Sequence, residues 1–289
     1  MKDVVPFINW TYFFRAWRLI DDYRNITALT CNCKACKEAW IKKFPPERQE
    51  QAREAMKLFL DTQRLINRWI FTEKIGIKAI IYLVPTHTSE DDCLIFDLPS
   101  GSVKIPFLRQ QESNSNHLSL VDFVRPDNDY TCLFGLTAGL GLDKIDFNED
   151  TYQKLLAQSV CDRLAEASSE WLHYQVRTHY WGYSNESLDL KRILAEKYDG
   201  IRPAVGYSVM PDQSILFRFN EILNLSEIGI SLTENAAMHP TSSICGLMIA
   251  NPNAHYFMIN KIGTDQLEDY AKRKNSTAEI EKKWLSQVL

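Results

Sequence analysis

Residues 200–207 read Gly-Ile-Arg-Pro-Ala-Val-Gly-Tyr, and their types suit the binding of a small ligand. Pro203 disfavours helical backbone at Arg202 and has no N–H of its own, while Gly206 lets a ligand approach the backbone closely. The pattern predicts an extended strip with free backbone carbonyls and amides. Arg202 is suited to hold a carboxylate through two parallel hydrogen bonds. The alternative is a structural turn in which Arg202 pairs with a neighbour such as Glu196.

Motifs of the common catalytic classes do not occur in the chain. There is no GxGxxG after a predicted strand, no GxxxxGK[ST], no HExxH and no GxSxG, and the 6 histidines have no metal-ligand spacing. Cys31, Cys33 and Cys36 form a group of thiols that suits a soft metal, but no fourth ligand follows at a zinc-site spacing. We therefore expect no catalytic side chain and no metal, and the sequence leaves the role of these thiols open.

Composition excludes several classes of function. A net charge of −4 over 289 residues gives no overall basic surplus for nucleic acid, and the basic run at 272–274 is expected to be the solvated end of a helix. No apolar run reaches the roughly 18 residues of a membrane span, and the N-terminus lacks the features of a signal peptide. The 7 scattered cysteines suit a reducing compartment. We expect a soluble, cytoplasmic protein.

Hydrophobic periodicity and turn residues predict the elements that position the strip. Strands and helices mix without βαβ alternation, which favours an α+β fold with a largely antiparallel, twisted β-sheet flanked by helices. No clean linker interrupts the chain, so one domain over residues 1–289 is expected. The expected elements are a helix over 46–74, a buried strand over 75–84 closed by Pro85, a hairpin of 93–98 and 102–108, a strand over 131–138, a helix over 148–180 capped by Asn148 or Asp150, a strand over 255–262, a helix opened by 264–265, and a short helix with a capping box at 276–279.

Further segments accompany the Arg-Pro-Ala-x-Gly-Tyr pattern of residues 202–207 in a fixed order. They are VPFINWT at 5–11 with Phe13, Phe14 and Trp17, LRQQ at 108–111, DFV at 122–124, DRLAEA at 162–167, WLH at 171–173, YWGY at 180–183, LTE at 232–234 with Ala237, Met238 and Pro240, and QLEDYA at 266–271. Together these segments resemble the activation domain of cobalamin-dependent methionine synthase, essentially from end to end.

The resemblance implies a domain that binds S-adenosylmethionine, from which cobalamin is remethylated after oxidation to the inactive cob(II)alamin form. It implies that Arg202 holds the ligand carboxylate. Glu166 would face the cationic amino or sulfonium group, and Tyr256 would offer an aromatic face to the sulfonium. The alternatives are a solvated Glu166 and a Tyr256 packed in a strand. The full set of expected binding residues is Asn9, Glu166, Arg202, Ala204, Gly206, Tyr207, Tyr256 and Phe257.

The sequence also departs from the family. Asn9 stands where the family has a binding aspartate, the loop at 239–243 differs, and residues 24–44 do not match closely. Nothing resembles the DxHxxG cobalamin motif or the zinc-thiol homocysteine site. A free-standing domain is therefore expected, which meets cobalamin only through a partner protein.

Two functions follow from these observations. The first is a reactivation subunit, a component of cobalamin-dependent methionine synthase that acts in trans on a cobalamin-bearing module, with electrons from flavodoxin or another reductase. The second is a divergent, non-catalytic binding or regulatory protein that docks on a corrinoid protein or senses S-adenosylmethionine. An independent small-molecule methyltransferase is disfavoured, because the chain offers no candidate base or metal site.

Overall fold

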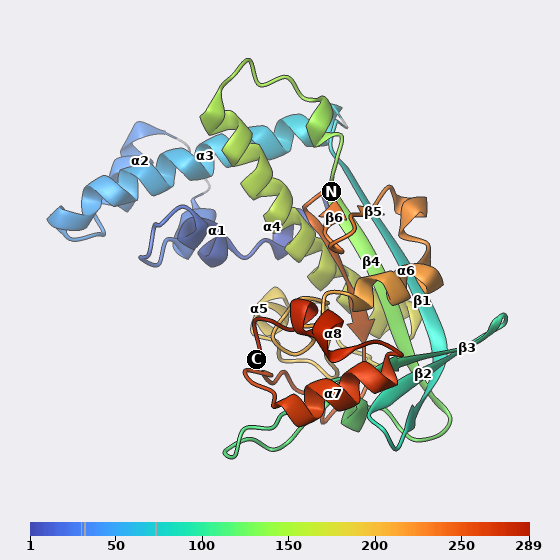
Figure 1. The fold of residues 1–289 in the computed structure, drawn as a ribbon. Helices are drawn as coiled ribbons and strands as arrows, with labels where there is room; N and C mark the ends of the chain where they lie inside the picture. Colours follow the sequence, from blue (N-terminus) through green and yellow to red (C-terminus); the bar gives the residue numbers. More distant parts are fainter. Residues whose placement is uncertain (30, 32, 73) are drawn as a thin grey trace. The chain divides into compact units, whose positions relative to one another are not determined.

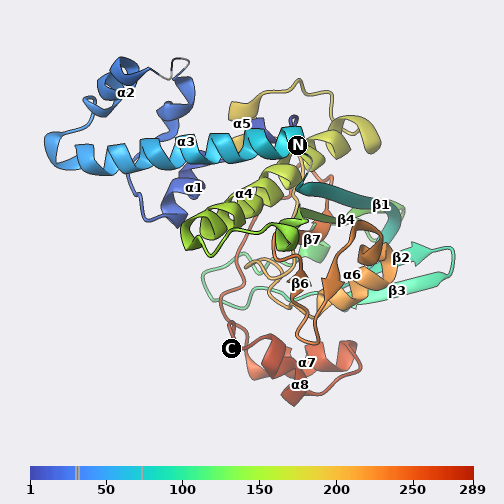
Figure 2. The ribbon, with the colours of Figure 1, turned by 90° about the horizontal axis from the view of Figure 1, so that it is seen from above.

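The computed structural model describes residues 1–29, 31, 33–72 and 74–289 (Figures 1 and 2). They form two compact units, Met1–Ile77 with Ala138–Trp171, and Lys78–Thr137 with Leu172–Leu289. The single domain over 1–289 stays a prediction. The helices are α1 (Trp10–Ala16), α2 (Lys34–Ile41), α3 (Gln49–Thr72), α4 (Thr151–Gln175), α5 (Leu190–Leu194), α6 (Ile215–Leu223), α7 (Thr264–Arg273) and α8 (Ala278–Trp284). The strands are β1 (Gly76–Ser89), β2 (Cys93–Leu98), β3 (Gly101–Pro106), β4 (Asp129–Leu140), β5 (Ser231–Leu232), β6 (Met238–His239) and β7 (Ser243–Met248).

The first unit is built on the long helix α3, which confirms the helix predicted over 46–74. Its apolar face is buried at helical spacing, and Figure 2 shows α2 lying beside it. The ring of Trp10 on α1 packs edge-on against Phe59 of α3, with 4.8 Å between their centroids. Tyr152 at the start of α4 donates a 2.8 Å hydrogen bond from its hydroxyl to Asp61 of α3. Aromatic packing and this hydrogen bond therefore hold the helices of the first unit together.

Helix α4 confirms the helix predicted over 148–180. Asp150 caps its start, because its carboxylate accepts a 3.0 Å hydrogen bond from the Gln153 N–H. Beyond Gln175 the chain continues as a π-helical turn over Val176–Tyr180. Among the described residues, none of these helices is both long enough and apolar enough to cross a membrane.

A five-stranded sheet with the order β3-β2-β1-β4-β7 organises the second unit. The pairs β1–β2, β2–β3 and β4–β7 are antiparallel, so the predicted α+β fold with a largely antiparallel sheet is confirmed. The predicted end of the strand at Pro85 is wrong, because β1 continues to Ser89. The pairing of β1 with β2 runs from Thr86 to Ser89, so Pro85 lies outside it. The prediction that this strand is buried is also wrong, since most of its side chains are at least partly exposed.

Helix α6 provides the main helical cover of this sheet's core. Phe219 of α6 is fully buried and packs edge-on against Phe96 of β2, with 6.3 Å between the ring centroids. Both belong to one apolar cluster that includes Leu133 of β4 and Leu247 of β7. This apolar core therefore fixes the position of β7, the edge strand of the sheet.

The C-terminal helices α7 and α8 lie side by side (Figure 1) and correct two sequence predictions. The side chain of Thr277, rather than Ser276, caps α8 by accepting from the Ile280 N–H. Lys274 is not a solvated helix end: its ammonium binds the carboxylates of Asp212 and Glu281, which are 1% and 2% exposed. Two nearly buried carboxylates thus share one cation.

We predict that Lys274→Met lowers the free energy of unfolding by about 3–5 kcal/mol, because it leaves Asp212 and Glu281 buried without their counter-ion. Urea denaturation followed by circular dichroism measures this. The matched control is Arg218→Ala, which removes an exposed ion pair with Glu221 and should cost less than about 1 kcal/mol. Equal small losses in the two variants would contradict the role of Lys274.

Candidate ligand-binding site

Residues 200–205 run beside the edge strand β7. Ile201 and Ile249 exchange two backbone hydrogen bonds of 3.0 Å, and the Val205 N–H donates to the Cys245 carbonyl at 2.9 Å. The predicted extended strip is therefore confirmed. The prediction that its backbone groups are free is wrong at Ile201 and Val205, because these groups form hydrogen bonds with Ile249 and with Cys245 of β7.

Glycine at position 246 allows this close approach. A Cβ there would lie 2.2 Å from the carbonyl oxygen of Pro203 and 2.8 Å from the Cα of Ala204, so any larger residue would push the strip away from β7. Gly206 ends the strip at φ +88°, a left-handed conformation that favours glycine. Its N–H donates to the Met210 carbonyl at 2.8 Å and closes a turn.

The strip holds Arg202 next to Tyr256. Arg202 is 9% exposed, and its backbone N–H donates a 3.0 Å hydrogen bond to the Tyr256 hydroxyl. The aromatic side chains of Tyr207 and Tyr256 are 53% and 39% exposed. The structure thus brings two of the predicted binding residues, Arg202 and Tyr256, together through this hydrogen bond.

The segment around Tyr256 is extended but is not a strand, so the strand predicted over 255–262 is wrong. Its backbone is bonded to side chains and loops instead of a neighbouring strand. The Ile259 N–H donates to the Ser208 carbonyl at 2.9 Å, and the Gln110 amide donates to the Met258 carbonyl at 2.8 Å. Phe257, which is half-buried, lies 6.2 Å from Phe123 between ring centroids.

The LRQQ segment is the scaffold that holds this stretch. Arg109 forms two 2.7 Å hydrogen bonds with Asp122 and further bonds with Asp92, and these bonds raise the pKa of its guanidinium. Its backbone exchanges two hydrogen bonds with the side chain of Gln266 on α7, of 2.8 and 2.9 Å. The family-like segments at 108–111, 122–124 and 266–271 therefore fix one another and the stretch that carries Tyr256.

A buried histidine lies in the electrostatic surroundings of Arg202. His173 is fully buried, and its ring packs edge-on against Tyr198 at 5.1 Å. Burial lowers the pKa of His173 well below 6.5, and the nearby charges of Arg177 and Arg202 lower it further. The imidazole is therefore neutral at pH 7, which avoids placing a third cation beside the two arginines.

Arg177, close to the same histidine, is held by Glu186 and Tyr198. Its Nε donates a 2.6 Å hydrogen bond to Glu186, and its guanidinium lies 4.0 Å from the centre of the Tyr198 ring. Sequence reasoning noted the WLH and YWGY segments around these residues but missed His173 and Arg177 as neighbours of the strip. His173 belongs to the WLH segment and Arg177 lies between it and the YWGY segment, and no other signal in the sequence pointed to them.

Two predicted binding residues lie in the first unit. The side-chain oxygen of Asn9 caps α1 by accepting a 3.1 Å hydrogen bond from the Thr11 N–H. Glu166 is half-buried on α4. Their role in binding stays a prediction.

The three clustered cysteines also lie in the first unit. Their Sγ atoms all lie within 4.8 Å of one another. Hydrogen bonds lower the pKa of the Cys33 thiol to about 7. The largest effect comes from the backbone N–H of Cys36, and the thiol of Cys31 adds to it. Hydrogen bonds from the Cys36 thiol to Cys33 and Cys31 raise the pKa of Cys36 to about 11. The three thiols are thus close enough to change one another's pKa.

The structure has an α+β fold with an extended strip beside an edge strand, and the comparisons with known proteins agree with that fold. The family described as vitamin B12 dependent methionine synthase, activation domain, matches residues 1–275, so the chain belongs to this family. A solved structure, described as the crystal structure of the MetH reactivation domain bound to AdoHcy, is similar with a TM-score of 0.84 and 29% sequence identity. The match covers 99% of this chain and 87% of that one.

The neutral, buried His173 predicts a pH dependence of stability. Below about pH 6.5 the unfolded chain binds a proton at this residue that the folded chain does not, because the folded pKa lies well below 6.5. Stability should therefore fall as pH falls through this range, by up to about 1.4 kcal/mol per pH unit from this group.

Urea midpoints measured between pH 7 and about pH 5 test this. His173→Gln should flatten the slope, whereas His179→Gln, on an exposed position of the same helical segment, should leave it unchanged. Equal slopes in the wild type and His173→Gln would contradict the burial argument.

Proposed function

We propose that the chain binds S-adenosylmethionine along residues 202–207 and presents its methyl group for reductive reactivation of cobalamin on a separate methionine synthase protein. The observation that carries this proposal is the nearly buried Arg202 at the start of an extended strip, fixed beside Tyr256. Family membership and the AdoHcy-bound neighbour support the ligand class. AdoHcy is the product that S-adenosylmethionine becomes when it loses its methyl group.

The residues of the strip fit the parts of this ligand. Arg202 offers a forked set of donors to the amino-acid carboxylate. Ala204 and Gly206 keep the strip narrow, so a ligand can lie against its backbone. The exposed aromatic faces of Tyr207 and Tyr256 attract a sulfonium cation. The carboxylate and the sulfonium of the ligand thus each have a group of matching chemistry in the second unit.

The chemistry requires positioning rather than acid–base groups. S-adenosylmethionine would supply an electrophilic methyl group, and a partner's cobalamin, given one electron by flavodoxin or another reductase, would supply the nucleophile that takes this methyl group, with AdoHcy as the second product. No proton moves in that transfer, so the chain needs no general base. Its residues hold the carboxylate and the sulfonium so that the methyl group faces outward.

Calorimetric titration with S-adenosylmethionine tests the ligand and its orientation. We expect Arg202→Ala to weaken binding by about 10- to 150-fold, because it removes a charged hydrogen-bonding partner of the carboxylate. Methylthioadenosine, which lacks the amino-acid portion, should bind the wild type and Arg202→Ala equally. The control Arg218→Ala alters an exposed arginine elsewhere and should leave both affinities unchanged.

Two outcomes would contradict the proposal. One is a folded wild-type protein that binds neither S-adenosylmethionine nor AdoHcy. The other is an equal loss of affinity for S-adenosylmethionine and for methylthioadenosine in Arg202→Ala, which would mean that Arg202 supports the fold of the strip and does not contact the carboxylate.

The second candidate function is a divergent binding protein that senses S-adenosylmethionine or docks on a corrinoid protein without methyl transfer. Asn9 favours it, because an amide already engaged in capping α1 replaces a charged family residue. Transfer of labelled methyl from S-adenosylmethionine to a cobalamin-bearing methionine synthase that lacks its own activation domain, with a chemical reductant, discriminates the two. The reactivation function predicts label on the partner's cobalamin. Ligand binding with no label above a reaction without this chain favours the divergent protein.

A further inference from the structure

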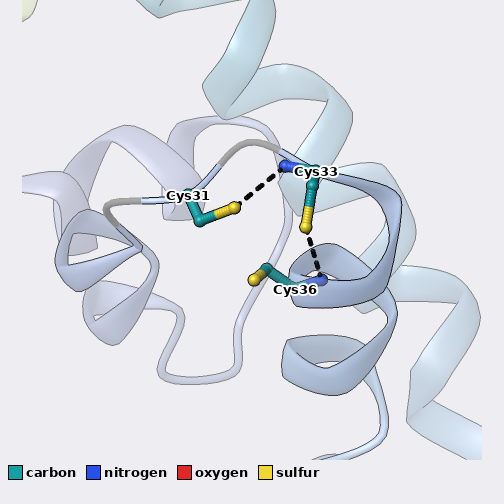
Figure 3. A group of neighbouring side chains, drawn as sticks. All are labelled: Cys31, Cys33 and Cys36. Atoms are coloured by element: carbon teal, nitrogen blue, oxygen red, sulfur yellow. Dashed lines mark hydrogen bonds between the residues drawn. The ribbon is translucent and has the colours of Figure 1, made fainter.

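Cys31, Cys33 and Cys36 form a compact thiol group that the proposed function does not use. Figure 3 shows the three sulfur atoms directed toward a common space at the start of α2. All three lie within 4.8 Å of one another, Cys31 and Cys33 are exposed, and Cys36 is partly exposed. The space between the sulfurs is therefore open to an ion from solvent.

The local backbone holds the sulfurs in place. The Cys33 N–H donates to the Cys31 Sγ and the Cys36 N–H donates to the Cys33 Sγ, both at 3.4 Å. Cys33 is also the N-cap of α2, where the helix dipole favours a negative sulfur. Both backbone donors therefore stabilise sulfur in the anionic form that binds metals.

The segments on either side of the thiols are anchored in the first unit. Trp40 near the end of α2 is buried, and its indole N–H donates a 3.0 Å hydrogen bond to the side chain of Asn25. Its ring also packs against Tyr23 and Phe44, at centroid distances of 6.1 and 4.9 Å. The segment before Cys31 and the helix after Cys33 are thus tied to each other independently of any ion.

The spacing of the sulfurs indicates one ion and its class. Sulfurs bound to one zinc ion at about 2.3 Å lie about 3.8 Å apart in tetrahedral geometry, so a small inward movement from 4.8 Å suffices. A [4Fe–4S] cluster requires wider spacing, because each of its cysteines binds a different iron. Thiolates select soft ions such as Zn²⁺ and Cu⁺. Among the described residues no histidine or carboxylate joins the group, which leaves further coordination to water or an outside ligand.

The other four cysteines provide an internal contrast. Cys93, Cys132, Cys161 and Cys245 are buried. Burial raises the pKa of the last three to about 12, which disfavours the thiolate. Reactivity and metal binding of the folded chain should therefore be confined to the three clustered thiols.

We propose that Cys31, Cys33 and Cys36 bind a single soft metal ion, Zn²⁺ or Cu⁺, through three thiolates. Binding releases the protons of those thiols that are still protonated and involves no change in oxidation state. The ion would link the segment before Cys31 to the first turn of α2.

The test uses the full chain, reduced and stripped of metal with a chelator. Zn²⁺ and, under anaerobic conditions, Cu⁺ are titrated in competition with chromophoric chelators, and Co²⁺ serves as a spectroscopic probe of thiolate binding. We expect one ion per chain, thiolate-to-cobalt charge-transfer absorption, and protection of the three clustered thiols from alkylation. The tighter of the Zn²⁺ and Cu⁺ titrations identifies the preferred ion.

Variants separate this site from other metal binding. The triple variant Cys31→Ser, Cys33→Ser, Cys36→Ser should lose the ion and the absorption, whereas Lys34→Ala, an exposed change within the same segment, should keep both. Circular dichroism and the urea midpoint check that each variant is folded. This readout does not depend on the proposed function, because metal stoichiometry is measured without S-adenosylmethionine.

Three results would overturn the proposal. The first is a folded, reduced wild type that binds neither ion, and the second is equal stoichiometry in the wild type and the triple variant. The third is a reduced chain that takes up no metal but forms a disulfide within the group on air oxidation, which would make the thiols a redox pair.

Discussion

The contact between the 200–205 strip and β7 is the constraint on which the candidate site depends. Two backbones approach there so closely that a Cβ on Gly246 would fall 2.2 Å from the Pro203 carbonyl oxygen. The pairing uses the polar backbone groups of the strip that face β7, and it leaves Arg202 next to Tyr256. The sheet core under β7 therefore sets the position of the guanidinium.

A second set of interactions fixes the other side of the site with side chains in place of a β-ladder. Arg109 and Gln110, from the loop after β3, bind α7 and the backbone near Tyr256. The polar side chains of the LRQQ and QLEDYA segments thus hold the stretch that carries Tyr256. His173, close enough to Arg177 and Arg202 for their charges to lower its pKa, is neutral and adds no further charge, and Arg177 is paired with Glu186.

The sequence predicted the long helices, the hairpin and the extended strip because each is set by local periodicity or by proline and glycine. It did not predict that residues 255–262 avoid the sheet. Their β-prone side chains suggested a strand, but their backbone partners are Gln110 and Ser208, which lie far away in the sequence. Lys274 was misassigned for the same reason, since its two carboxylate partners come from other segments. The cysteine spacing was visible in the sequence, whereas the convergence of the sulfurs depends on the start of α2 and on the packing of Trp40.

Hydrogen–deuterium exchange with and without S-adenosylmethionine tests most directly that the strip beside β7 is the binding site. We predict that the ligand slows exchange in peptides covering 200–210 and 251–259, with little change in the β2–β3 hairpin. Protection confined to other segments, or tight binding with no change in these two, would contradict the account.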